Sequence, residues 1–225
     1  VYFVGKIGEM LGGKKVMYIA GMLAATNPLL IYYSQEGRTY ALTAFLVTAS
    51  MYYYLRLQKE FNLKNSILYT LYSILFLWSS YLSWFFFAAL VIYTLYLKRF
   101  DIIKLQVLSA TTLLLWLPSF MGSLSIGNST RTTSPEWGKV VGGLSWKSLP
   151  LTWVKFSLGR ISFDNKMLYA AIVSVVGIIH LLILRALPKI HNSKSITPLI
   201  LWLIAPIILG ITTAAFLPVY QYFRV

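Results

Sequence analysis

Long apolar runs separated by short polar connections constrain this chain more than any other feature of its sequence. Each run is long enough to cross a hydrocarbon core roughly 30 Å thick as a helix. The runs are continuous rather than alternating, which favours helices over the strands of a membrane barrel. The composition agrees, because 58% of the residues are hydrophobic and only 12% are charged. We therefore expect an all-α, polytopic transmembrane helix bundle.

About seven full spans are predicted, each of roughly membrane length. They cover about residues 16–33, 39–57, 66–80, 83–97, 105–121, 167–184 and 198–217. The polar centre SSYLS divides the run 66–97 into two short helices joined by a tight turn. A long connection, 122–166, separates the last two spans from the others. The end segments, 1–4 and 221–225, resemble parts of further spans, so we expect residues 1–225 to be a central fragment of one transmembrane domain.

The basic residues predict the orientation of the spans, because short cytoplasmic loops carry an excess of Lys and Arg. Four alternate connections hold such residues: Lys6, Lys14, Lys15, Arg56, Lys59, Lys64, Lys98, Arg99, Lys104, Arg185, Lys189 and Lys194. Assigning them to the cytoplasm places the turn around residue 36 and the 122–166 loop on the extracytoplasmic side. The formal charge of +14 then follows from orientation and anionic lipid, and it requires no nucleic acid.

Several apparent motifs do not predict chemistry. The segment GEMLGGKK has the glycine spacing of a phosphate-binding loop, but Lys15 replaces the Ser or Thr that would hold magnesium, and no strand precedes it. His180 and His191 have no second type of ligand at helical spacing, which argues against a histidine metal site. Both histidines are expected in or near the cytoplasmic half, away from the polar 122–166 loop, which argues against a Ser/His/Asp triad.

The aromatic residues allow two interpretations in each of two segments. The run WSSYLSWFFF is consistent with a groove for a lipid tail, and equally with an aromatic belt at the membrane interface. Trp137, Trp146 and Trp153 accompany basic residues in the long loop. Such a loop could cover a glycosyl phosphate ligand, or it could rest on lipid head groups.

Glu36 and Arg38 interrupt the apolar sequence at a short connection. In one interpretation they are polar residues of a two-helix turn, where an acid near the start of the next helix is mildly stabilising. In the other, the carboxylate takes a proton or holds a cation, and the guanidinium binds phosphate oxygens. The residues alone leave both interpretations open.

The segment 27–57, NPLLIYYSQEGRTYALTAFLVTASMYYYLRL, resembles the signature region of the polyprenyl-phosphate-dependent glycosyltransferases of the GT-C class. Relatives include protein O-mannosyltransferases and lipid A aminoarabinose transferases, in which a turn reading like YSQEARMYA opens a transmembrane helix. Gly37 and Thr39 depart from that pattern. The matching positions are Tyr33, Ser34, Gln35, Glu36, Arg38, Tyr40 and Ala41. The ending FLPVYQYFR resembles, more loosely, a later proline and aromatic-arginine segment of the family.

The resemblance implies a multi-pass glycosyltransferase of a prokaryotic plasma membrane or of the endoplasmic reticulum. Such an enzyme moves a sugar from a polyprenyl-phosphate donor to a protein, lipid or glycan acceptor on the extracytoplasmic face, usually with inversion. Glu36 would be the second acid of the site, with the principal acid expected upstream of this chain. The resemblance leaves a divalent metal at Glu36 open, although one carboxylate makes no metal site.

The same resemblance assigns substrate-binding roles to other residues. Arg38 would be a phosphate or structural partner, and Gln35 and Tyr33 would be polar lining. Tyr40 and Arg224 are further candidates for binding the substrate. The alternative function is a transporter or flippase that binds a lipid-linked sugar or phospholipid without breaking a bond, which would need polar groups near the membrane midplane. A purely structural membrane subunit is a third hypothesis.

Overall fold

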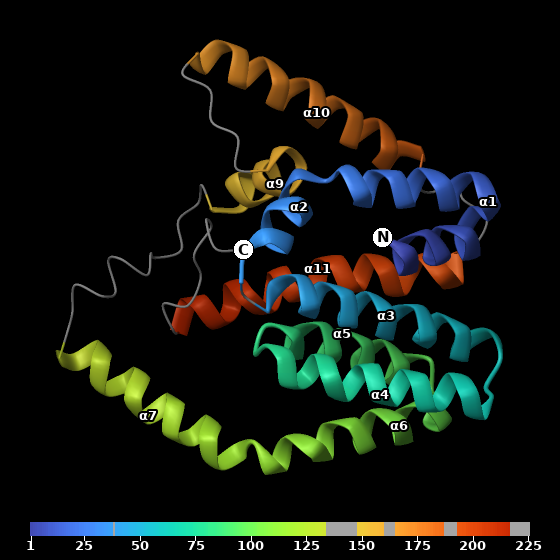
Figure 1. The fold of residues 1–225 in the computed structure, drawn as a ribbon, viewed down its shortest axis with the longest axis vertical. Helices are drawn as coiled ribbons and strands as arrows, with labels where there is room; N and C mark the ends of the chain where they lie inside the picture. Colours follow the sequence, from blue (N-terminus) through green and yellow to red (C-terminus); the bar gives the residue numbers. More distant parts are fainter. Residues whose placement is uncertain (38, 134–147, 160–164, 187–192, 217–225) are drawn as a thin grey trace. The chain divides into compact units, whose positions relative to one another are not determined.

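The computed structural model describes residues 1–37, 39–133, 148–159, 165–186 and 193–216 (Figure 1). Within these ranges the regular structure is entirely helical, which confirms the all-α prediction. The chain forms two compact units. Unit 1 comprises Val1–Arg38, Trp146–Thr197 and Tyr222–Val225, and unit 2 comprises Thr39–Ser145 and Pro198–Gln221. The division into two units does not show whether the chain is one transmembrane domain, so the single domain stays a prediction.

Unit 1 begins with α1 (Tyr2–Thr26), which folds back on itself. The backbone leaves helical geometry at Gly12 and Gly13, and Gly13 has a φ of 77°, a conformation that glycine adopts without steric cost. A Cβ atom on Gly8 would lie only 2.9 Å from the carbonyl oxygen of Val16, so the two halves pack closely. Figure 1 shows them side by side. The glycine-rich segment is therefore the turn of a helical hairpin, and helix precedes it, as expected for a sequence that is not a phosphate-binding loop.

The predicted span 16–33 is not one helix. Helix α1 ends at Thr26, and α2 (Pro28–Gln35) follows at an angle of 53°. Asn27 caps α2, and Pro28 has no N–H group to donate to a preceding turn, so α1 cannot continue through this point. Unit 1 also contains α9 (Ser148–Leu158) and α10 (Lys166–Ala186). Helix α9 lies within the predicted long loop.

Unit 2 is built on helices that follow one another along the chain. They are α3 (Tyr40–Lys59), α4 (Leu63–Ser79), α5 (Ser83–Tyr96), α6 (Phe100–Thr111), the short 3-10 helix η1 (Thr112–Leu115) and α7 (Leu117–Thr133). The sequence SSYLS forms the tight turn between α4 and α5, as predicted. The predicted span 105–121 is broken instead of continuous, because α6 and η1 end at Leu115 and α7 leaves at an angle of 57°. Pro118 lies in the first turn of α7, where proline is tolerated.

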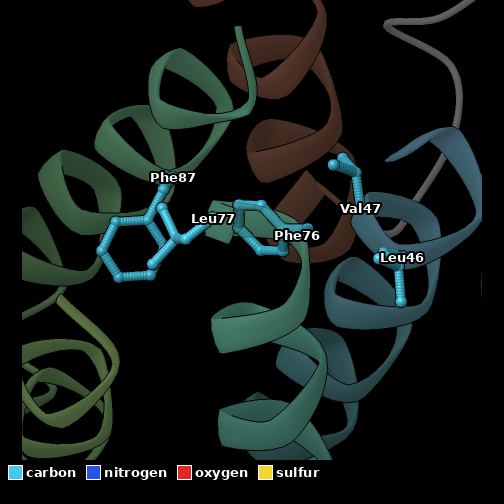
Figure 2. Close-up of a cluster of buried hydrophobic side chains, with 5 residues drawn as sticks. All are labelled: Leu46, Val47, Phe76, Leu77 and Phe87. Atoms are coloured by element: carbon cyan, nitrogen blue, oxygen red, sulfur yellow. The ribbon is translucent and has the colours of Figure 1, made fainter. Parts of the chain in front are cut away.

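A hydrophobic cluster holds α3, α4 and α5 together (Figure 2). Leu46 and Val47 come from α3, Phe76 and Leu77 from the end of α4, and Phe87 from α5. Each of these side chains is at most 8% exposed. Their packing holds the three helices together. In a membrane bundle this stabilisation comes from close contact between helices and not from removal of side chains from water.

A buried hydrogen-bond network connects the same helices with α6. The Nε2 group of Gln106 donates to the Tyr69 hydroxyl at 3.1 Å and to Thr94 Oγ1 at 3.0 Å. The hydroxyls of Tyr54 and Thr94 are 2.9 Å apart. All four side chains are at most 1% exposed. These hydrogen bonds form only when each helix has one rotation about its axis. Any other rotation would leave a buried polar group unpaired, at a cost of about 1–3 kcal/mol.

The basic connections of unit 2 lie at one end of its helices. Arg99, between α5 and α6, donates to the carbonyl oxygens of Leu57 at 3.2 Å and Gln58 at 3.4 Å, near the end of α3. The same guanidinium forms an ion pair with Asp101 at 2.6 Å, which holds the pKa of that carboxyl below its usual value. Two connections predicted to be cytoplasmic, those after α3 and after α5, are therefore neighbours.

Within the described residues, fewer helices than predicted are long and apolar enough to cross a membrane. Among the described residues, one helical stretch is long and apolar enough to cross a membrane, namely Ile196–Thr213 within α11 (Ser193–Phe216). Up to three spans result if each of the two bent pairs, α1 with α2 and α6–η1 with α7, crosses as one. Helices Ser83–Tyr96 and Lys166–Leu182 are apolar but shorter. The seven-span architecture is therefore not confirmed.

Candidate functional site

Helix α2 presents the segment on which the functional hypothesis depends, and Asn27 defines where it begins. The Oδ1 atom of Asn27 accepts hydrogen bonds from the backbone N–H groups of Leu29 and Leu30, each at 3.0 Å. This side-chain cap satisfies amide groups that have no partner inside the helix, and such a cap contributes about 1 kcal/mol. Pro28 at the first helical position completes the start signal.

The long connection contacts α2 at this same point. Asn27 Nδ2 donates to the carbonyl oxygen of Phe156 in α9 at 3.4 Å. Gly159, just after α9, has a φ of 77°, and a Cβ atom there would lie 2.7 Å from Pro28 Cβ. Only glycine fits both that conformation and that approach. Helix α9 therefore fixes the start of α2, and through it the position of the residues at the end of α2.

Glu36 lies directly after α2, in extended backbone with φ −75° and ψ 136°. Its side chain is partly buried, and its Oε2 atom is buried without a hydrogen-bond partner among the described residues. Burying a carboxylate oxygen without a hydrogen-bond donor costs more free energy than burying an unpaired neutral group, because the carboxylate carries charge. The arrangement leaves an acceptor ready for a proton, a cation or a hydroxyl of a ligand.

The other predicted site residues divide into three groups. Tyr33 and Gln35 belong to the last turn of α2, where Tyr33 is half-buried with its ring edge on Tyr32 and Gln35 is exposed. Tyr40 begins α3 and belongs to unit 2. Arg38 and Arg224 lie outside the described residues. The structure therefore brings Tyr33, Gln35 and Glu36 to the end of α2 and leaves the phosphate-binding role of the two arginines a prediction.

His180 contacts a residue of the 122–166 loop, from which the sequence predicted it to be apart. The sequence separated it from the 122–166 loop, yet its ring meets that of Trp153 in α9 edge-to-face, with the ring centres 5.4 Å apart. The cause is that α9 packs along α10, where Trp153 also approaches Gly177. His180 Nδ1 lies 2.8 Å from the carbonyl oxygen of Val176, one turn earlier. A backbone carbonyl and an indole ring are partners that orient a histidine side chain within the fold.

No group of three or more metal-ligating side chains occurs within the described ranges. Glu36 accordingly stands without the further carboxylates or histidines that would complete a divalent-metal site from this part of the chain.

The comparisons with known proteins identify no relative. No protein-family model matches the chain, and neither does any curated protein or solved structure. We therefore infer a function from residues 27–57 and from their geometry.

The most informative residue that the sequence analysis did not single out is Asn27. An Asn-Pro pair is a recognisable helix start, with the asparagine as cap and the proline in the first turn. Its contact with Phe156, which lies 129 positions later, leaves no signal in a single sequence.

Proposed function

We propose that this chain is part of a membrane glycosyltransferase of the GT-C class. In this proposal it moves a sugar from a polyprenyl-phosphate donor to a protein, lipid or glycan acceptor on the extracytoplasmic face of the membrane. The observation that carries the proposal is the buried Oε2 atom of Glu36, which has no hydrogen-bond partner among the described residues and lies within the segment YSQEGRTYA. A structural turn would leave that carboxylate in water, where its hydrogen bonds are satisfied.

The proposed reaction needs a proton acceptor and a stabilised leaving group. The acceptor hydroxyl oxygen bonds to the anomeric carbon, and the bond from that carbon to the donor phosphate oxygen breaks. The hydroxyl proton passes to a carboxylate, and polyprenyl phosphate leaves with the electron pair. Glu36 would serve as the second acid of the site, and Arg38 would stabilise the negative charge that develops on the leaving phosphate.

A membrane location is consistent with the exposed surface of the described helices. Large apolar side chains stand exposed along α10 and α11, which is unfavourable in water and ordinary in lipid. They are Val175, Ile178, Ile179, Leu181 and Leu182 in α10, and Leu201, Leu203, Ile204 and Ile208 in α11.

The test is sugar transfer by the full-length protein in membranes, comparing wild type with Glu36→Gln. The amide keeps the size of the side chain but cannot act as a base. We expect transfer to fall by about a hundredfold, within the 10²–10⁴ range for loss of an acid or base. Glu60→Gln is the matched control, because Glu60 is an exposed acid at the other end of α3. Arg38→Ala, paired with the exposed Arg56→Ala, tests the phosphate contact in the same assay.

Undiminished transfer by both Glu36→Gln and Arg38→Ala would contradict the proposed site. Absence of transfer by the wild type, together with movement of the intact donor across the membrane, would favour the transporter.

A further inference from the structure

A pocket lined mainly by aromatic rings lies at the turn between α4 and α5, within unit 2. Its volume is about 210 Å³, and it is lined by Leu77, Trp78, Ser79, Ser80, Tyr81, Trp84 and Trp116. Trp116 comes from the junction of η1 with α7, and its ring centre lies 5.9 Å from that of Trp78 and 6.4 Å from that of Tyr81. These rings contact one another at tilts of 56° and 46° instead of forming a flat stack.

Two of the three indole rings are held by hydrogen bonds before any ligand arrives. Trp78 Nε1 donates to Thr112 Oγ1 at 3.1 Å, and Trp84 Nε1 donates to the carbonyl oxygen of Leu77 at 2.9 Å. Trp78 nevertheless remains 47% exposed and Tyr81 46% exposed. Rings that are already ordered lose little entropy on binding, so such a surface is preorganised for a ligand.

The polar groups of the lining are neutral hydroxyls. Ser79 donates to the carbonyl oxygen of Phe76 at 2.8 Å and lies 2.9 Å from the hydroxyl of Thr43. Ser80 Oγ accepts from the backbone N–H of Leu82 at 3.3 Å, which leaves its own proton for another acceptor. Among the described residues, the lining includes no Lys, Arg, Asp, Glu or His. This chemistry does not select a phosphate, which would need a cation or several N–H donors.

We propose that this pocket binds the ring of an uncharged sugar. A pyranose has an apolar face of C–H bonds, which packs on the electron-rich face of an indole, and a rim of hydroxyl groups, which would meet Ser80 and the Tyr81 hydroxyl. The volume suits one ring, not a long hydrocarbon chain. The inference rests on the proposed function and deepens it, because it names the ligand of this pocket as an uncharged sugar. The pocket lies at the end of unit 2 where α3 begins, as the contact between Thr43 and Ser79 shows.

The experiment is a titration of the full-length protein, in a detergent without a sugar head group, with methyl glycosides of glucose, mannose and galactose. Tryptophan fluorescence and saturation-transfer NMR report binding, and choline chloride serves as the comparator for a cation-binding aromatic cage. We expect saturable binding of at least one glycoside. Trp116→Ala should weaken it about tenfold, whereas Phe61→Leu, which changes an exposed aromatic residue before α4, should leave it unchanged.

Ser80→Ala keeps all of the rings and should also weaken binding, so the test holds even if Trp116→Ala does not fold. The proposal is overturned if no glycoside binds, if only choline binds, or if both pocket variants bind as the wild type does. Glu36→Gln separates the two proposals, because it should lower transfer by about a hundredfold while glycoside binding persists. Binding without any transfer by the wild type would remove the proposed function and leave the pocket standing.

Discussion

At the scale of single residues, two of the buried oxygen atoms that lack a hydrogen-bond partner among the described residues have different meanings. Glu36 Oε2 belongs to an ionisable group at the end of a helix, and Gln106 Oε1 belongs to a neutral amide whose Nε2 group is fully used. The amide is the centre of a network that fixes α4, α5 and α6. The carboxylate has no such structural role among the described residues, which is why it is the better candidate for chemistry.

Replacing Gln106 tests the structural role of the network. Gln106→Leu keeps the volume but removes the donor to Tyr69 and Thr94, so their hydroxyls lose a buried partner. We expect the free energy of unfolding to fall by about 1–3 kcal/mol, measured by thermal unfolding in detergent. Tyr69→Phe removes one of the same hydrogen bonds and should cost less. A Gln106→Leu protein as stable as the wild type would show that the network does not stabilise unit 2.

At the scale of elements, the start of α2 is the joint on which the candidate site depends. Asn27 both caps α2 and contacts α9, so one side chain connects the end of a predicted outer loop to the helix that directly precedes Glu36. A second asparagine, Asn62, caps α4 through its contact with the N–H of Asn65 at 2.9 Å. The two caps are chemically alike but lie in different units.

This pair gives a matched comparison. Asn27→Ala and Asn62→Ala should each lower stability by about 1 kcal/mol through loss of a cap. Only Asn27→Ala should also raise hydrogen exchange in α9 and reduce sugar transfer, because only Asn27 holds α9 and positions α2. Equal exchange in α9 for the two variants would contradict the role given to this joint.

The sequence predicts some of these elements well and others poorly, for local reasons. The turn SSYLS is marked by three serines within five residues, and the helices on either side of it end within a few residues of the predicted points. The breaks at Asn27 and Trp116 fall within apolar runs, where hydropathy alone continues the span. The contacts of Trp116 with Trp78 and of Asn27 with Phe156 join distant parts of the chain and are invisible to any local pattern.

At the scale of the whole molecule, the basic residues of alternate short connections predict sidedness. The chain has no cysteine, so single cysteines can report each connection without background. Gly37→Cys, exposed with open space around its Cα, should react with an impermeant maleimide applied from outside intact cells. Glu60→Cys, also exposed, should react only after permeabilisation. The same accessibility for both would contradict the predicted topology.

The most direct test of the central claim follows both halves of the donor at once. A polyprenyl-phosphate sugar carries one label on the sugar and another on the lipid, and it is given to the full-length protein in sealed vesicles with an acceptor. We expect the wild type to separate the labels, so that the sugar appears on the acceptor and the lipid remains as polyprenyl phosphate. Glu36→Gln should leave the two labels together. Labels that stay together with the wild type, while both change sides of the membrane, would contradict the proposed function.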